Sequence, residues 1–190
     1  MYTCRKSQQA FTLIELLITM SVLGVLMAIA LPNLRDFIVA NRLSSNVNGF
    51  IGLLSYARSE AIVRNKQVIV CAKANGASNA CVSDQQWGMY ETQVFVDEDG
   101  SNGFNSGDTL LKTLPAVDTS GTQFAFIRQN ASSTPVSIRF QTGGFAGSAF
   151  NFDMKVISTD SDYETKYGRT LCISRPGRAR VVTLTSSPCS

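Results

Sequence analysis

The sequence predicts an α+β fold in which a long N-terminal helix packs on an antiparallel β-sheet domain. Two observations lead to this class. Residues 11–65 hold an apolar run followed by a helical pattern, and residues 66–190 hold short β-rich runs separated by turn residues. A helix followed by strands is typical of α+β domains, in which a helix covers one face of an antiparallel sheet.

The composition fits a membrane segment joined to a lightly charged globular domain. Of the 190 residues, 44% are hydrophobic and only 16% are charged, whereas soluble domains carry roughly 25% charged residues. The net charge is +3, and without Arg5 and Lys6 it is +1 (15 basic minus 14 acidic residues). Overall charge therefore does not indicate nucleic-acid binding. The chain has no histidine, the commonest general base and metal ligand.

The first element is an apolar run from Phe11 to Leu31, which is long enough to span a bilayer as a helix. Arg5 and Lys6 precede it and place its N-terminal side in the cytoplasm. A secretory signal peptide has a shorter apolar region followed by a small-residue cleavage site. Here a helical pattern follows the run instead, so we expect a transmembrane helix over residues 11–31.

The second element is an amphipathic helix over residues 32–65, which continues the first beyond a predicted kink at Pro32. Its apolar residues recur at steps of three and four, which marks one face of a helix. We expect this face to pack on the globular domain and the helix to end near Asn65. The predicted face consists of Leu43, Val47, Phe50, Leu54, Ala57 and Ala61.

One carboxylate, Glu15, lies inside the apolar run. A charge in hydrocarbon costs several kcal/mol unless it is paired. The run itself carries no basic residue. We therefore expect the partner of Glu15 to be another chain or a terminal amine.

The stretch "AFTLIELLITMSVLGVLMAIALPN" resembles the N-terminus of type IV pilins and pseudopilins. The resemblance implies that residues 1–10 are a leader, which prepilin peptidase removes between Ala10 and Phe11. It also implies that the amine of Phe11 is N-methylated. Glu15 would then pair with the N-terminal amine of a neighbouring subunit during assembly. The family normally has glycine where this chain has Ala10.

The remaining elements are short strands in residues 66–190, the predicted globular domain. The order of elements, and residues 53–71 in particular, resemble the minor pilins and pseudopilins of the GspH/FimT/FimU family, which implies a type IV pilin fold. The runs that read as strands are "VIVCA", "QVFVDEDG", "DTLLKTL", "QFAFIRQN", "VSIRFQTGGFA", "FNFDMKVIS", "TLCIS" and "ARVVTLT".

Four cysteines lie beyond the leader, in two pairs that are local in sequence: Cys71 with Cys81, and Cys172 with Cys189. As disulfides, each pair would close a short loop and contribute about 3 kcal/mol. They would also indicate an oxidising compartment. The alternatives are buried free thiols or a zinc site, although no pair has the close ligand spacing of structural zinc.

The acidic loop from Asp97 to Asp108 has some features of a calcium loop. In the EF-hand pattern the sixth residue is glycine and the twelfth is glutamate, but here they are Asn102 and Asp108. A hairpin loop rich in Gly, Asn and Asp explains the composition equally well. We therefore predict no metal site, and the sequence leaves calcium binding by this loop open.

The C-terminal end carries four arginines between residues 169 and 190 and no acidic residue. Residues 177–180, Gly-Arg-Ala-Arg, resemble the Gly-Arg-x-Arg element of DNA-binding pilins used in natural transformation. The candidate contacts are Arg175, Gly177, Arg178 and Arg180, because arginine binds phosphate bidentately. The alternative is that these are solvated arginines at the start of a last strand.

No nucleophile–base pair is visible, so we expect neither an enzyme nor a cofactor. The resemblance implies a minor pilin that acts in pilus assembly and initiation at the tip. Two alternatives are a DNA-binding minor pilin for natural transformation and an H-type minor pseudopilin of type II secretion. The implied partners are other major and minor pilins, prepilin peptidase, the inner membrane and, in the second case, double-stranded DNA. The precursor would cross the inner membrane once, with its globular domain facing the periplasm, and would join the extracellular pilus on assembly.

Overall fold

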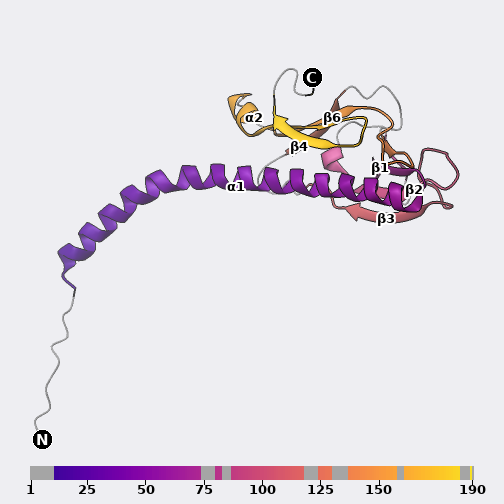
Figure 1. Ribbon diagram of the computed structural model, residues 1–190. Coiled ribbons are helices and arrows are strands. Elements are labelled where there is room, and N and C mark those ends of the chain that lie inside the picture. The colour runs from indigo at the N-terminus through magenta and orange to yellow at the C-terminus, as the bar shows by residue number, and fades with distance from the viewer. Residues whose placement is uncertain are drawn as a thin grey trace, which may run out of the picture. The chain divides into compact units, whose positions relative to one another are not determined.

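In the computed structural model the described residues are 11–73, 80–82, 87–117, 124–129, 137–157, 161–184 and 189. The predicted leader, residues 1–10, lies outside them. Figure 1 shows the long helix α1, Leu13–Arg64, leading into the strand-rich part of the chain. The chain divides into two compact units, Met1–Ala40 and Asn41–Ser190. The predicted α+β class, with a long helix packed on antiparallel sheet, is confirmed.

Helix α1 ends where the sequence predicts. Asn65 has a φ of 52°, the left-handed conformation that terminates many helices and that asparagine tolerates well. Its N–H donates to the carbonyl of Ile62 at 3.4 Å, which closes the last turn. The helix therefore stops one residue before Asn65, at Arg64.

The predicted apolar face of the second half of α1 is buried. Its six residues are between 0% and 4% exposed, and each large side chain removed from water contributes about 1.5–3 kcal/mol. Leu53, which the predicted set omits, is buried as well. The residues confirmed in this face are Leu43, Val47, Phe50, Leu54, Ala57 and Ala61.

The strands form two antiparallel sheets, a division that the pattern of strands in the sequence does not predict. The first sheet has the order β3-β2-β1-β5. Both central strands are fully buried, including the polar residues Thr92 and Gln93 at the start of β2. The bounds are β1 Val68–Ala72, β2 Thr92–Val96, β3 Thr109–Leu114 and β5 Ser137–Phe140.

The second sheet has the order β4-β6-β7-β8. Strand β6 alternates strictly between buried and half-buried residues, as a strand with one covered face should. Strand β8 pairs only with β7 and so forms an edge of this sheet. The bounds are β4 Phe124–Gln129, β6 Phe150–Val156, β7 Arg169–Ile173 and β8 Ala179–Thr183.

Two short helices were not predicted from the sequence. The 3-10 helix η1, Trp87–Met89, buries Trp87. The helix α2, Ser161–Tyr167, lies between β6 and β7. The guanidinium Nη1 of Arg169 donates to the carbonyls of Tyr167 at 3.2 Å and Gly168 at 2.8 Å. Arg169 therefore closes the C-terminal end of α2, where carbonyls lack partners within the helix.

Three aromatic rings from different elements meet in the core. Phe50 of α1 and Trp87 of η1 have ring centroids 6.1 Å apart, and each packs edge-on against Phe152 of β6, at 5.1 and 5.0 Å. Among the described residues every buried hydrophobic side chain lies at Val39 or beyond. Residues 36–190 therefore contain the whole described core and close it without the apolar run.

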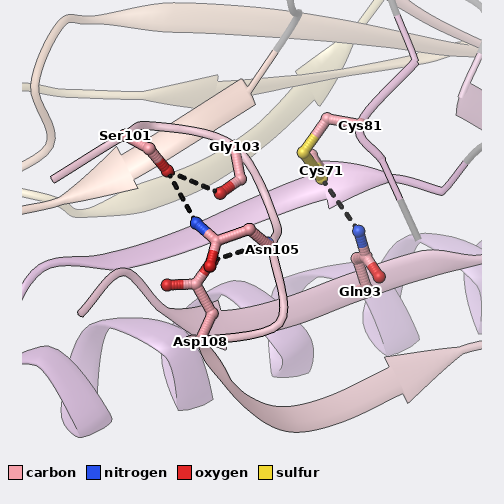
Figure 2. The surroundings of a disulfide bond; sticks show 7 residues. All are labelled: Cys71, Cys81, Gln93, Ser101, Gly103, Asn105 and Asp108. Carbon is pink, nitrogen blue, oxygen red and sulfur yellow. Dashed lines mark hydrogen bonds between the residues drawn. A yellow bond between two sulfur atoms is a disulfide. The ribbon is translucent and has the colours of Figure 1, made fainter. Parts of the chain in front are cut away.

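The two predicted disulfides are confirmed. Cys71 in β1 bonds Cys81, and Cys172 in β7 bonds Cys189. Cys71 is fully buried and also accepts a hydrogen bond on Sγ from Gln93 Nε2 at 3.4 Å, as Figure 2 shows. The alternatives of free thiols and a zinc site are thereby removed for these four cysteines.

Candidate functional site

The N-terminal end of α1 is a capping box built from Thr12 and Glu15. Both the N–H and the hydroxyl of Thr12 donate to Glu15 Oε2, each at 2.9 Å. In return the N–H of Glu15 donates to the Thr12 hydroxyl at 3.3 Å. Reciprocal bonds of this kind satisfy the free N–H groups of a first helical turn. Glu15 therefore has a polar partner within its own chain, which the sequence analysis did not foresee.

The other hydroxyls near this end are satisfied by the helix itself. Thr19 donates to the carbonyl of Leu16 at 2.9 Å and Ser21 to that of Leu17 at 2.8 Å. Such bonds let hydroxyl side chains lie in an apolar environment without an orphaned donor. The polar residues of the run are thus compatible with lipid or with a packed bundle of helices.

The apolar side chains of residues 11–31 are all exposed in the isolated chain. By length and composition, α1 is the one helix among the described residues that is apolar enough to cross a membrane, and its most apolar window has no buried residue. An apolar surface of this extent requires lipid or other apolar segments around it. The side chains available for such contacts include Leu13, Leu16, Leu23, Leu26 and Ile29.

The C-terminal arginines lie on a turn whose shape depends on Gly177. This glycine has a φ of 76° and its N–H donates to the carbonyl of Ser174 at 2.8 Å. A Cβ atom at this position would lie 2.4 Å from the carbonyl oxygen of Gly144. That same oxygen accepts a hydrogen bond from Arg58 Nε at 3.0 Å. Gly177 therefore brings the turn directly against the backbone at Gly144 and next to α1.

The structure brings the candidate arginines to one depression of about 760 Å³ on the second sheet. Arg175, Arg178 and Arg180 all line it, together with Cys172 and Cys189 of the disulfide. All three arginines are exposed, so their guanidinium groups are accessible to a ligand. Arg178 also lines a second hollow of about 600 Å³, where it lies with Arg58 and Ile62 of α1. Sequence reasoning missed Arg58, because only the fold brings α1 beside this turn.

The acidic loop between β2 and β3 gathers three carboxylates. Oxygens of Asp97, Asp99 and Asp108 lie within 4.8 Å of one another. Burial raises the pKa of the Asp97 carboxyl, and the nearby charge of Asp108 acts in the same direction. Hydrogen bonds from Ser101 lower the pKa of Asp99. The loop thus brings together carboxyl groups whose surroundings shift their pKa values in opposite directions, upward for Asp97 and downward for Asp99.

Comparison with known families gives two matches. Residues 46–177 match the model of the type II transport protein GspH. Residues 5–31 match the prokaryotic N-terminal methylation motif. Together the matched ranges include Ala10, Phe11 and Glu15 as well as Gly177.

Curated relatives and solved structures agree with these matches. A fimbrial protein of Pseudomonas aeruginosa is 29% identical over 117 residues, which cover 61% of this chain and 70% of that protein. The fimbrial protein EcpC of Eikenella corrodens is 33% identical over 102 residues, or 52% of this chain and 61% of its own. A crystal structure of the type IV minor pilin FimU of Pseudomonas aeruginosa superposes with a TM-score of 0.53 at 22% identity. It covers 80% of this chain and 94% of FimU.

Proposed function

We propose that this chain, which belongs to the family of the type II transport protein GspH, is a minor pilin that helps to start the assembly of a type IV pilus. The family membership makes the chain a structural subunit of a pilus or a secretion pseudopilus, and not an enzyme. As such a subunit it assembles with other pilins. The methylation motif and the exposed apolar helix fit a membrane-anchored pilin before assembly.

Two similarities favour the pilus over the secretion pseudopilus. Both curated relatives reported above are fimbrial proteins. The fold is shared with FimU, a minor pilin of type IV pili. The proposal therefore names a pilus as the assembly. In this proposal the precursor crosses the inner membrane once and its globular unit faces the periplasm.

The observation that carries the proposal is the polar pair at the start of an exposed apolar helix. Both bonds from Thr12 end on Oε2 of Glu15, and Oε1 accepts no bond from the described residues. In this proposal prepilin peptidase cuts between Ala10 and Phe11, and the Phe11 amine is then methylated. Glu15 keeps its capping bonds in the membrane and offers Oε1 to the amine of a neighbouring subunit. A charge-assisted bond in a low-dielectric environment is strong, so it sets the register of the two helices.

Immunogold labelling tests the role at the tip. Antibody against residues 36–190 should label one end of each sheared pilus, and a strain lacking the chain should make fewer pili of ordinary length. Fewer pili of unchanged length indicate a defect in initiation, because elongation is then intact. Label spread evenly along the fibres would contradict the proposal.

A second candidate function, DNA binding for natural transformation, is favoured by the arginine turn. Arg175, Arg178 and Arg180 are exposed around one depression, and an edge strand leaves that surface open. Each phosphate that an arginine neutralises contributes to affinity through counterion release. Three contacts give weak binding without sequence preference, which suits a protein that takes up any double-stranded DNA.

A gel shift with residues 36–190 at low salt tests this candidate. The fragment should retard double-stranded DNA, and Arg178→Gln with Arg180→Gln should abolish the shift. Lys66→Gln with Lys112→Gln makes the same change of net charge at the turn before β1 and in β3, and should leave the shift in place. Absence of binding by the unmutated fragment, or equal loss in both double variants, would remove the DNA function.

A further inference from the structure

The loop between β2 and β3 contains a group of oxygen atoms that the assembly function does not use. Carboxylate oxygens of Asp97, at the end of β2, of Asp99 in the loop and of Asp108, just before β3, lie within 4.8 Å of one another. Three carboxylates at this separation repel one another whenever all are ionised, unless a cation lies between them. Among the ion pairs of the described residues, none includes these three aspartates.

A second observation concerns the buried oxygen of Asp97. This residue is only 6% exposed. Its Oδ2 accepts hydrogen bonds from Gln67 Nε2 at 2.9 Å and from the N–H of Asn102 at 3.2 Å. Its Oδ1 is buried and has no partner among the described residues. Buried carboxylate oxygens are normally hydrogen-bonded or bound to a metal, so Oδ1 indicates a missing positive partner.

The loop supplies further oxygens of the kind that calcium prefers. The hydroxyl of Ser101 donates to the carbonyl of Gly103 at 3.0 Å, and Asn105 Nδ2 donates to that hydroxyl at 3.1 Å, as Figure 2 shows. The same Nδ2 donates to Asp99 Oδ2 at 3.0 Å. A hydroxyl oxygen and a carbonyl oxygen are thus held in the same hydrogen-bonded loop as the aspartates. Calcium takes six to eight such ligands, whereas magnesium demands a strict octahedron.

The backbone also takes the shape that a calcium loop needs. Asn102 has a φ of 64°, which is the left-handed conformation that the sixth-position glycine provides in an EF-hand loop. Asparagine adopts this conformation more readily than most residues. The sixth position, which counted against calcium in the sequence, is therefore no obstacle. At the twelfth position the shorter Asp108 lies with the other two aspartates.

We propose that this loop binds one calcium ion through Asp97, Asp99 and Asp108. The ion gives Asp97 Oδ1 its partner and neutralises the three carboxylates. Ser101 and the carbonyl of Gly103 complete the coordination together with water. Extracellular calcium modules bind with dissociation constants of about 10⁻⁴ to 10⁻³ M, and we expect this site to bind in the same range.

The ion would fix a loop that is already attached to the core. The ring of Phe104 packs edge-on against Phe95 of β2 with centroids 5.1 Å apart. Phe104 and Cys81 both pack against a buried cluster that includes Cys71. Calcium would therefore join the acidic loop to the same region that the Cys71–Cys81 disulfide holds, and would stabilise the β2–β3 end of the globular unit.

Calcium titration of the full chain in detergent micelles tests the proposal. Calcium chloride added to metal-free protein should bind with a stoichiometry of one by calorimetry and should raise the unfolding temperature. Magnesium chloride at the same concentration should give at most a tenth of the affinity. No binding and no shift in unfolding temperature up to 10 mM calcium would overturn the proposal, as would equal binding of magnesium.

A matched pair of variants separates a built site from general attraction to an acidic loop. Asp99→Asn should weaken calcium binding at least tenfold. Glu98→Gln removes the same charge from the neighbouring residue, which pairs with Lys66 instead, and should change affinity by less than threefold. Equal weakening in the two variants would contradict a specific site. If Asp99→Asn fails to fold, the preference of the unmutated chain for calcium over magnesium still tests the proposed site.

Discussion

Gly177 is the residue on which the arginine turn depends. Its φ of 76° disfavours any residue with a Cβ, and the added atom would lie 2.4 Å from the Gly144 oxygen. Gly177→Ala should therefore lower the free energy of unfolding by about 1–3 kcal/mol. Urea denaturation of residues 36–190 measures the change.

Gly49 provides the matched control for this substitution. It lies exposed in α1, and a Cβ there would meet nothing within 4 Å. Gly49→Ala should raise the free energy of unfolding by up to about 1 kcal/mol, because alanine is the better helix former. Equal stability of Gly177→Ala and the unmutated fragment would contradict the description of the turn.

Individual residues show where sequence reasoning succeeds and where it stops. Asn65 is predicted to end α1, and it does so with a positive φ. By residue type, Asn102 does not fit the sixth position of a calcium loop, yet it adopts the left-handed conformation that glycine provides there. The bonds between Thr12 and Glu15 were visible in principle, because a threonine three residues before a glutamate is the signature of a capping box. Considered only as a charge in an apolar run, Glu15 is expected to pair with another chain or a terminal amine instead.

At the scale of elements, Phe50 joins the second half of α1 to η1 and β6. Its ring packs edge-on against both Trp87 and Phe152 and is 1% exposed. Phe50→Ala should cost about 3–5 kcal/mol, since it removes a large buried side chain and leaves a cavity. Phe145→Ala removes a 57% exposed ring and should cost less than about 0.5 kcal/mol. Thermal or urea unfolding of both variants measures the difference, and similar losses would contradict the assigned core.

The two disulfides lie in different sheets, so the stability lost by removing one should not depend on whether the other is present. Cys71–Cys81 fastens β1 of the first sheet, and Cys172–Cys189 fastens β7 of the second. Replacing either pair by alanines should destabilise the domain by about 3 kcal/mol, close to the loop-entropy value. The two losses should add within about 0.5 kcal/mol when both pairs are removed. A strong departure from additivity in urea denaturation would show that the two regions are energetically coupled.

The positions of the long helix and the strands were more predictable from the sequence than the pairing of the strands into sheets. The apolar steps of α1 follow a period of 3.6 and β6 follows a period of 2. The buried strands β1 and β2 do not alternate, but their β-rich composition between turn residues marks them as strands. The division into two sheets depends on contacts between distant residues, such as Val68 of β1 with Phe140 of β5. The short helices η1 and α2 span only a turn or two, which is too short for a clear periodic signal.

At the scale of the whole molecule, the chain combines two parts with different solvent requirements. Residues 36–190 contain the entire described core, whereas residues 11–31 bury nothing in the isolated chain. A segment that is exposed and almost wholly apolar is stable only in lipid or among other helices. The two parts therefore need different surroundings: the described core lies in residues 36–190, and residues 11–31 need lipid or other helices around them. The predicted boundaries at residues 10, 31 and 65 remain predictions for the precursor.

The central claim is that Glu15 recruits this subunit into the fibre, and recovery of a Glu15→Ala variant in sheared pili tests it most directly. Glu60→Ala, which removes a carboxylate paired with Arg64 farther along the same helix, serves as the control. Membrane and sheared fractions should be quantified by immunoblot with antibody against residues 36–190. Glu15→Ala should stay in the membrane fraction with at least a tenfold loss from pili, while Glu60→Ala appears in pili normally. Ordinary recovery of Glu15→Ala in pili would contradict the account.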